Sequence, residues 1–489
     1  MNVSSGKQLC KEGSDTCSTD KDLETPANGM PYKSPEEKRF VRKMNWTILP
    51  LVAFIIFIQF ADKAAISVAA VLGLMEDTHI SGEQFSWVAS IFYLGYLVYQ
   101  LPNNYLLQKV PHGRYLGVLL LMWGTVMCTT SLCHNFAELM ATRFLLGLFE
   151  AGTSPCIFII LNTLYRRTEQ AACFGYVAAC TGMGAVIGTL LSFAISFMEG
   201  VAGLRAWRWV YIILGAITIF FGFIVFFFLA DDPNHKLLRL TEVEKEIVKE
   251  RTQDNAVVRS RKIKTYQMWE ALKEPRLWLI LLASLCINFQ NGALVNFSAT
   301  LVKGFNFSAT ESIILQIPSG LAAAFAAIIA VITARKSRQA IYTGIGMGIV
   351  SAIGCLLLAV IPQSAGAVKL LGYYLSWAMA GAYTIILTVI ANNVSGYTKK
   401  IFYNGAYMIF STFGNFIGPL MMVQTQAPGY VGGMIGYTVA NVVVIICLIL
   451  IRYIMAKENR RRLADPPTEP TDVYLDLTDA EDRNYIYRL

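Results

Sequence analysis

The sequence predicts an all-α polytopic membrane protein with twelve transmembrane helices in two six-helix halves. Three observations lead to this prediction: an apolar composition, about twelve long apolar segments, and one charged stretch between the sixth and the seventh segment. Of the 489 residues, 55% are hydrophobic and 15% are charged, and the mean hydropathy is +0.48. Soluble domains are about one quarter charged, so this composition indicates a membrane protein.

Each apolar segment reaches the length of about 20 residues that a helix needs to cross the hydrocarbon core of a bilayer. Six segments precede the charged stretch, at residues 46–73, 84–107, 115–134, 138–161, 170–198 and 207–230. Six follow it, at residues 276–302, 310–334, 340–361, 367–391, 402–424 and 431–456. We therefore divide the chain into an N-terminal tail (1–45), an N-terminal half (46–230), a linker (231–275), a C-terminal half (276–456) and a C-terminal tail (457–489).

The C-terminal tail is polar and contains Pro466, Pro467 and Pro470. This composition predicts that at least part of the tail is disordered.

Basic residues mark the loops on one side of the membrane. They crowd both tails, the linker and the loops after the second, fourth, eighth and tenth segments, whereas the loop at 74–83 carries only acidic charges. The positive-inside rule therefore places both termini and the linker in the cytoplasm. The net charge of +8 is then explained by membrane topology. We therefore expect no nucleic-acid partner.

The sequence offers no pattern that is typical of an enzyme. The ten cysteines are scattered through the chain without CxxC spacing, which excludes a metal or disulfide framework. No nucleophile–base pair or metal-ligand cluster occurs in the apolar segments.

The first apolar segment carries two charges, Asp62 and Lys63, in an otherwise uncharged run. A charge near the middle of a membrane helix costs about 2.5–3.5 kcal/mol on insertion scales, so it usually faces a protein interior or a wet cavity. Gln59, Lys63 and Ser67 fall on one stripe of a helix, and Asp62 points about 100° away from it. This stripe predicts a binding surface for an anion, with Lys63 as its cation and Gln59 beside it.

The fourth segment places Arg143, Gly147, Glu150 and Ser154 on one helical face. Glu150 lies at a depth similar to that of Lys63, so the two side chains are candidate partners across a cavity. A carboxyl group in an apolar interior can exchange a proton near neutral pH. If the protein couples to protons, we therefore expect Glu150 or Asp62 to be the carrier. Arg143 is a further candidate for substrate binding. The alternative for all these charges is packing by ion pairing.

Uncharged candidates lie in the seventh and tenth segments. Asn288 and Asn291 share one helical face, and Trp377 lies one turn from Tyr373. Amide and aromatic groups suit the hydrogen bonding and stacking of a ring- or amide-bearing anion. Ordinary helix packing is the alternative explanation.

Six stretches of the sequence are typical of one transporter family. They are YRRTEQ (165–170), GVAGLRAWRW (200–209), LTEVEK (240–245), NGAL (291–294), GNFIGP (414–419) and LDLTD (475–479). With these stretches the chain resembles the major facilitator superfamily, and more narrowly the fungal anion:cation symporters of the allantoate permease group. The likeness covers nearly all of residues 35–489.

The resemblance implies the major facilitator fold and alternating-access, proton-coupled uptake of a small organic anion at a fungal plasma membrane. Candidate substrates include allantoate, ureidosuccinate, nicotinate and pantothenate. More distant animal organic-anion transporters are similar in having a basic residue at the position of Lys63 and a glutamate at that of Glu150. We expect a monomer in the lipid bilayer, with the proton as coupling ion and no other cofactor.

Two departures from the family pattern concern the site and one loop. Family members more often have arginine at the position of Lys63, followed two residues later by asparagine, where this chain has Ala65. Lysine lacks the planar fork that binds a carboxylate through two hydrogen bonds, so the substrate geometry is expected to differ. The loop after the second segment has Gln108 and Lys109 where Asp-Arg is usual. A transporter-like nutrient receptor is the alternative function, and the short tails disfavour it.

Overall fold

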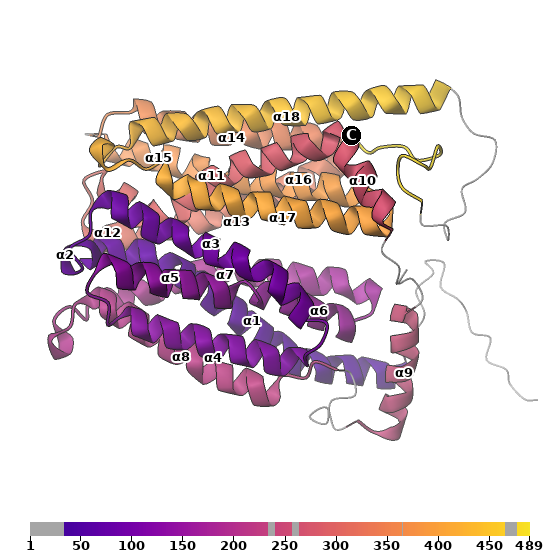
Figure 1. Ribbon diagram of the computed structural model, residues 1–489, viewed down its shortest axis with the longest axis horizontal. Coiled ribbons are helices and arrows are strands. Elements are labelled where there is room, and N and C mark those ends of the chain that lie inside the picture. Colours follow the sequence, from indigo (N-terminus) through magenta and orange to yellow (C-terminus); the bar gives the residue numbers. More distant parts are fainter. Residues whose placement is uncertain (1–33, 233–239, 257–263, 364, 465–476) are drawn as a thin grey trace, which may run out of the picture.

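The computed structural model describes residues 34–232, 240–256, 264–363, 365–464 and 477–489, and within these ranges it is helical without any strand. Its long helices form two bundles, one from each half of the chain (Figure 1). The N-terminal bundle contains α1 (Pro35–Val71), α3 (Gly82–Leu106), α4 (His112–Thr130), α5 (Phe136–Glu150), α6 (Thr153–Leu164), α7 (Arg167–Ser196) and α8 (Ala206–Phe228). The C-terminal bundle contains α11 (Pro275–Lys303), α12 (Ala309–Ile314), α13 (Ile317–Ser337), α14 (Ala340–Val360), α15 (Gly366–Ser376), α16 (Met379–Asn393), α17 (Tyr397–Leu420) and α18 (Val431–Ala464).

Shorter elements lie between these helices. They are α2 (Leu74–Asp77), the 3-10 helices η1 (Val201–Gly203) and η3 (Gln424–Gln426), and the linker helices α9 (Glu242–Ala256) and α10 (Thr265–Lys273).

The described helices account for twelve membrane crossings. Nine spans are long and apolar enough to cross a bilayer, and in this count α5 with α6, α12 with α13, and α15 with α16 each make one broken span. The long helices α3, α4 and α17 complete the set.

The first span begins earlier than the apolar pattern predicts. Ser34 caps α1 by accepting a hydrogen bond of 3.1 Å from the backbone N–H of Glu37, and Pro35 occupies the first helical position. Proline fits there because the nitrogen of the first helical residue has no hydrogen-bond partner within the helix. The acids Glu36 and Glu37 in the first turn complement the helix dipole. The helix therefore includes part of the predicted N-terminal tail.

Hydrogen bonds join the two bundles at one end of the molecule, which we call the closed end. The Ser67 hydroxyl accepts a bond of 2.8 Å from the backbone N–H of Ala299, and the Ser86 hydroxyl donates one of 3.2 Å to the carbonyl of Met422. The backbone N–H of Gly82 donates a bond of 2.8 Å to the Gln424 side chain. The opposite end, which we call the terminal end, carries α9, α10 and the C-terminus (Figure 1).

The last residues of the chain, 477–489, pack against the C-terminal bundle. Asp479 is fully buried there, and its carboxylate contacts Arg276 and lies 2.8 Å from the Lys399 ammonium group. The Tyr487 hydroxyl donates a hydrogen bond of 2.8 Å to the same carboxylate, and the backbone of Tyr487 exchanges two bonds with the Asn459 side chain. The predicted disorder of the tail therefore does not extend to this segment, and residues 465–476 lie outside the described residues.

Substituting Asp479 by asparagine is expected to destabilise the protein by about 3 kcal/mol, because it removes the shared partner of two buried cations. Burial raises the pKa of Asp479, but the charges of Arg276 and Lys399 outweigh this effect and hold it below its ordinary value. The stabilisation is therefore complete above about pH 4 and is lost as the pH falls through the lowered pKa. Thermal unfolding of the detergent-solubilised variant against pH measures the effect. Glu481→Gln, an exposed change in the same segment, is the control; equal unfolding temperatures for both variants would contradict the prediction.

Candidate functional site

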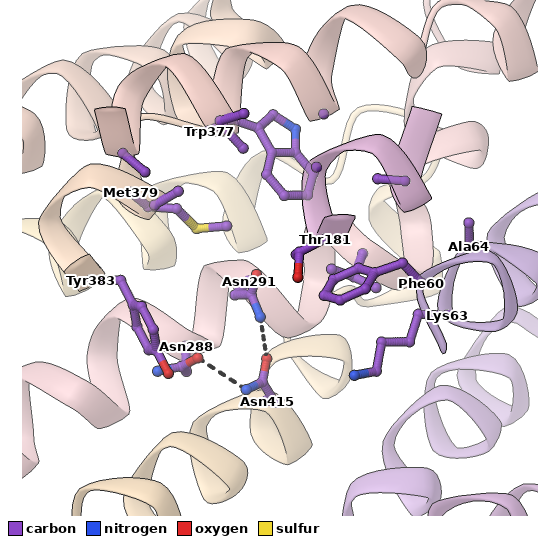
Figure 2. Close-up of a pocket in the computed structure, with 18 of the residues that line it drawn as sticks. Phe60, Lys63, Ala64, Thr181, Asn288, Asn291, Trp377, Met379, Tyr383 and Asn415 are labelled. Atoms are coloured by element: carbon purple, nitrogen blue, oxygen red, sulfur yellow. Dashed lines mark hydrogen bonds between the residues drawn. The ribbon is translucent and has the colours of Figure 1, made fainter. Parts of the chain in front are cut away.

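A cavity of about 780 Å³ lies between the two bundles (Figure 2). This volume suits a small organic molecule. Residues from both bundles line it, among them Phe60, Lys63, Tyr93, Tyr96, Asn288, Asn291, Trp377, Tyr383 and Asn415. The hydrogen bonds of Ser67, Gly82 and Ser86 join the two bundles at the closed end.

Lys63 presents the positive charge of the cavity, and Glu150 lies directly behind it. The Lys63 ammonium group is 2.9 Å from Glu150 Oε1; the Lys63 side chain is 26% exposed, whereas Glu150 is completely buried. Gln59 donates a hydrogen bond of 3.0 Å to the same carboxylate oxygen, and its amide lies 3.3 Å from the Ser154 hydroxyl. The structure thus brings together Lys63, Glu150 and Gln59, all of which the sequence singles out.

Asp62 and Arg143 lie inside the N-terminal bundle, away from the cavity wall. Asp62 accepts a hydrogen bond of 2.9 Å from the Trp123 indole, and Arg143 donates one of 2.5 Å to the Tyr211 hydroxyl. Both side chains are almost fully buried and neither lines the cavity. The adjacent residues Asp62 and Lys63 therefore belong to different polar clusters in this conformation.

Three asparagines form a hydrogen-bonded group on the wall contributed by the C-terminal bundle. The Asn415 amide donates a bond of 3.0 Å to Asn288 Oδ1 and accepts one of 2.8 Å from the Asn291 amide (Figure 2). The Lys63 side chain extends from α1 toward Asn415 (Figure 2). One wall of the cavity thus offers a cation, and another offers amide donors and acceptors.

Asn415 is a site residue that the sequence reasoning missed. It lies between Gly414 and Gly418 in the GNFIGP stretch. In the sequence, the likeness of this stretch to the family was the only feature that pointed to Asn415. A Cβ atom at Gly418 would stand 2.1 Å from the Phe289 carbonyl oxygen, so these glycines let α17 approach α11 closely. This close approach brings Asn415 into contact with Asn288 and Asn291.

Tyr93 and Tyr96 are two further site residues that were not predicted from the sequence. Both come from α3 and line the cavity together with Lys63. Aromatic residues three positions apart in an apolar segment are indistinguishable from ordinary packing residues in the sequence.

Broken helices place polar groups at the depth of the cavity. Pro155 supplies no N–H to the carbonyl of Ala151, and α5 ends at Glu150. The break between α15 and α16 lies at Trp377, which lines the cavity, as does Gln316 at the break between α12 and α13. Interrupted helices are tolerated within a membrane where they line a cavity, and they often mark binding sites.

Charge and ligand chemistry limit what this site can hold. Lys63 is the one formally charged side chain among the described residues that line the cavity. In the part of the chain that the structure describes, no group of three or more His, Cys, Asp or Glu residues is arranged to hold a metal ion. The described cavity wall therefore offers one cationic group, which Glu150 contacts from behind.

Residues 52–419 match the model of the Major Facilitator Superfamily. The allantoate permease of Saccharomyces cerevisiae is 30% identical over 476 residues, which cover 93% of this chain and 87% of the permease. The thiamine pathway transporter THI73 of the same yeast is 32% identical over 454 residues, covering 92% of this chain and 86% of that transporter. An uncharacterized transporter of Schizosaccharomyces pombe is 32% identical over 465 residues, covering 93% and 90% of the two chains.

Solved structures share the fold at low sequence identity. A bacterial homologue of the human lysosomal transporter Spinster, in an inward-facing and occupied conformation, superposes with a TM-score of 0.69 and 16% identity, covering 86% of this chain and 98% of that one. A D-xylose–proton symporter gives a TM-score of 0.61 at 13% identity, covering 84% and 97%. At these identities the likeness concerns the fold alone.

Proposed function

The chain belongs to the major facilitator superfamily, and from this premise we propose that it imports a small organic anion together with protons by alternating access. As a multi-pass membrane transporter it is not an enzyme. The observation that carries the proposal is the pair of Lys63 and Glu150, in which the cation faces the cavity and the acid is buried behind it. This arrangement suits an exchange of partners between a substrate carboxylate and a proton.

Competition for Lys63 is the proposed coupling step. While Glu150 is ionised it holds the Lys63 ammonium group, and a substrate carboxylate must compete for that charge. Protonation of Glu150 removes the competing charge and frees Lys63 for the substrate. Conversely, a substrate that takes Lys63 leaves the buried Glu150 without a counter-ion, which favours its protonation. Each ligand therefore promotes binding of the other, as reciprocal linkage requires.

The amide and aromatic groups opposite Lys63 support a carboxylate with a polar or ring-bearing body. Asn288, Asn291 and Asn415 can hydrogen-bond a ureide or amide, and Trp377 can stack on a ring. The similarity to an allantoate permease supports the same class. We accordingly propose allantoate-like anions, or vitamin carboxylates such as nicotinate and pantothenate. Ureidosuccinate carries a second carboxylate, so we expect it to bind more weakly than these monoanions.

The distribution of charge supports a topology. The linker helices α9 and α10 and the C-terminus lie at the terminal end, and the linker and the C-terminal tail are rich in basic residues, so we propose that this end is cytoplasmic. In the described conformation the two bundles are then joined on the opposite side of the membrane. We propose the plasma membrane as the site of uptake.

A panel of radiolabelled anions tests the function. Allantoate, ureidosuccinate, nicotinate and pantothenate are offered, at two pH values, to cells with and without the protein. We expect protein-dependent uptake of at least one of them, faster at the lower pH. Binding of a panel anion without flux would instead indicate the nutrient receptor, and pH-independent uptake would overturn the coupling to protons.

The single formal charge of the cavity predicts a preference for monoanions. Nicotinate and its dicarboxylate analogue quinolinate are a matched pair, and quinolinate is expected to compete at least about tenfold more weakly, because its second carboxylate finds no cation. Inhibition of labelled uptake by each compound measures the difference. Equal inhibition would show that a second positive group takes part in binding.

A further inference from the structure

Buried polar atoms without hydrogen-bond partners gather beside the break between α5 and α6. Among the described residues, Glu150 Oε2, Thr153 Oγ1, Asn103 Nδ2 and Gln100 Oε1 are all buried and unpartnered. Glu150, Thr153 and Asn103 are completely buried as whole residues. Native proteins leave few such atoms unsatisfied, and ordered water is their usual partner.

These atoms belong to helices that are in contact. A Cβ atom at Gly152 would stand 2.8 Å from Asn103 Oδ1 and 3.3 Å from the Tyr115 hydroxyl, so the break lies directly against α3 and α4. The Tyr115 hydroxyl donates a hydrogen bond of 2.7 Å to Asn103 and lies 2.9 Å from the Tyr99 hydroxyl. Hydrogen bonds thus connect Asn103, Tyr115 and Tyr99, and this polar series begins beside Gly152, the residue that precedes Thr153.

This polar series leads toward the terminal end. Asn103 lies in the last turn of α3, which ends at Leu106, and Tyr115 lies in the first turn of α4. Tyr99 and Tyr115 are only half-buried, in contrast to the completely buried Asn103.

Direct exchange between Glu150 and the cavity is obstructed. The carboxylate is completely buried, and its Oε1 is held by Lys63 and Gln59. The charged or titratable groups around it are Lys63 and Asp62 of α1, Tyr93 and Tyr96 of α3, and Arg143 of α5 itself. Of these, Lys63 is needed by the substrate at the same time.

We propose that Glu150 exchanges its proton with the terminal end through a hydrated polar path formed by Thr153, Asn103, Gln100, Tyr115 and Tyr99. The path is separate from the cavity that takes the substrate, and the inference rests on the proposed function of Glu150. The protonated carboxyl group gives its proton to the first water, each water passes one proton to the next, and one proton emerges at the terminal end; the hydroxyl and amide groups hold these waters by hydrogen bonds. The carboxylate left behind re-forms its ion pair with Lys63.

Isosteric substitutions test the path. Thr153→Val and Asn103→Leu remove polar atoms with little change in volume, Thr153→Ser retains the hydroxyl group, and Ser90→Ala removes another buried, unpartnered hydroxyl from α3. Ser90 lies one turn from Ser86, on the side of α3 that faces the C-terminal bundle, so it is a matched control. The purified variants are placed in vesicles with labelled allantoate or nicotinate. Two rates are then measured: acid-driven net accumulation, and exchange at equal pH.

Thr153→Val and Asn103→Leu are expected to slow net accumulation about tenfold, the rate equivalent of one lost hydrogen bond. Exchange should be unchanged, since no net proton moves, and both Thr153→Ser and Ser90→Ala should match the wild type. Wild-type accumulation in both path variants, or an equal loss of exchange, would overturn the path. If the wild type shows no acid-driven accumulation of either probe, the proposed function fails, and the inference fails with it. Either path variant suffices for the test should the other fail to fold.

Discussion

Glu150→Gln is expected to abolish acid-driven accumulation of the substrate while leaving exchange of internal and external anion intact. Glutamine keeps the size of the side chain and can still accept a hydrogen bond from Lys63 or Gln59, but it cannot gain or lose a proton. The anion then moves only down its own gradient, so its internal and external concentrations become equal. Accumulation and exchange in vesicles with an imposed pH gradient measure the two outcomes.

Two variants accompany this experiment. Glu83→Gln changes an exposed acid at the start of α3 and should behave as the wild type. Asp62→Asn tests the second candidate proton carrier, which is hydrogen-bonded to Trp123 and lies away from the cavity. If Glu150→Gln still concentrates the anion and Asp62→Asn does not, the coupling role belongs to Asp62.

Lys63→Ala is expected to reduce anion uptake about 100-fold, because a hydrogen bond to a charged group contributes up to about 3 kcal/mol. Lys63 is the one formal charge among the described residues of the cavity wall, so no neighbour replaces it. The variant also leaves the buried Glu150 without its cation. Uptake is compared at equal amounts of protein in the membrane.

Lys63→Arg and Lys303→Ala are the matched controls. Arginine preserves the positive charge and should retain a measurable part of the uptake, with altered selectivity because of its planar fork. Lys303 is exposed at the end of α11, and its removal should have no effect. Normal uptake by Lys63→Ala would show that the substrate does not depend on this cation.

Much of the fold could be predicted because insertion into a membrane depends on local properties of each segment. An apolar run of about 20 residues forms a helix in lipid whatever its neighbours are, since no other structure satisfies its backbone there. The predicted segments at 84–107, 115–134 and 402–424, for example, correspond to the helices α3, α4 and α17. The earlier start of α1 depends on the cap by Ser34, a signal that hydropathy does not contain.

Part of the candidate site was also readable from the sequence. A charge in an apolar segment needs a partner or water, so Lys63 and Glu150 could be singled out without coordinates. Asn415 could not, because asparagine also serves ordinary packing in membrane helices. Its contact with Asn288 and Asn291 depends on how closely α17 approaches α11.

The sequence by itself determined the membrane class, the two halves and the presence of a cation and an acid at similar depth. Only the tertiary structure decided which charges meet: Lys63 contacts Glu150, whereas Asp62, one residue away, contacts Trp123. It also decided that Asp479, at the far end of the chain, is buried against Arg276 and Lys399. The physical reason is that hydropathy acts on each segment alone, whereas the partner of a charge depends on the rotation and packing of several helices.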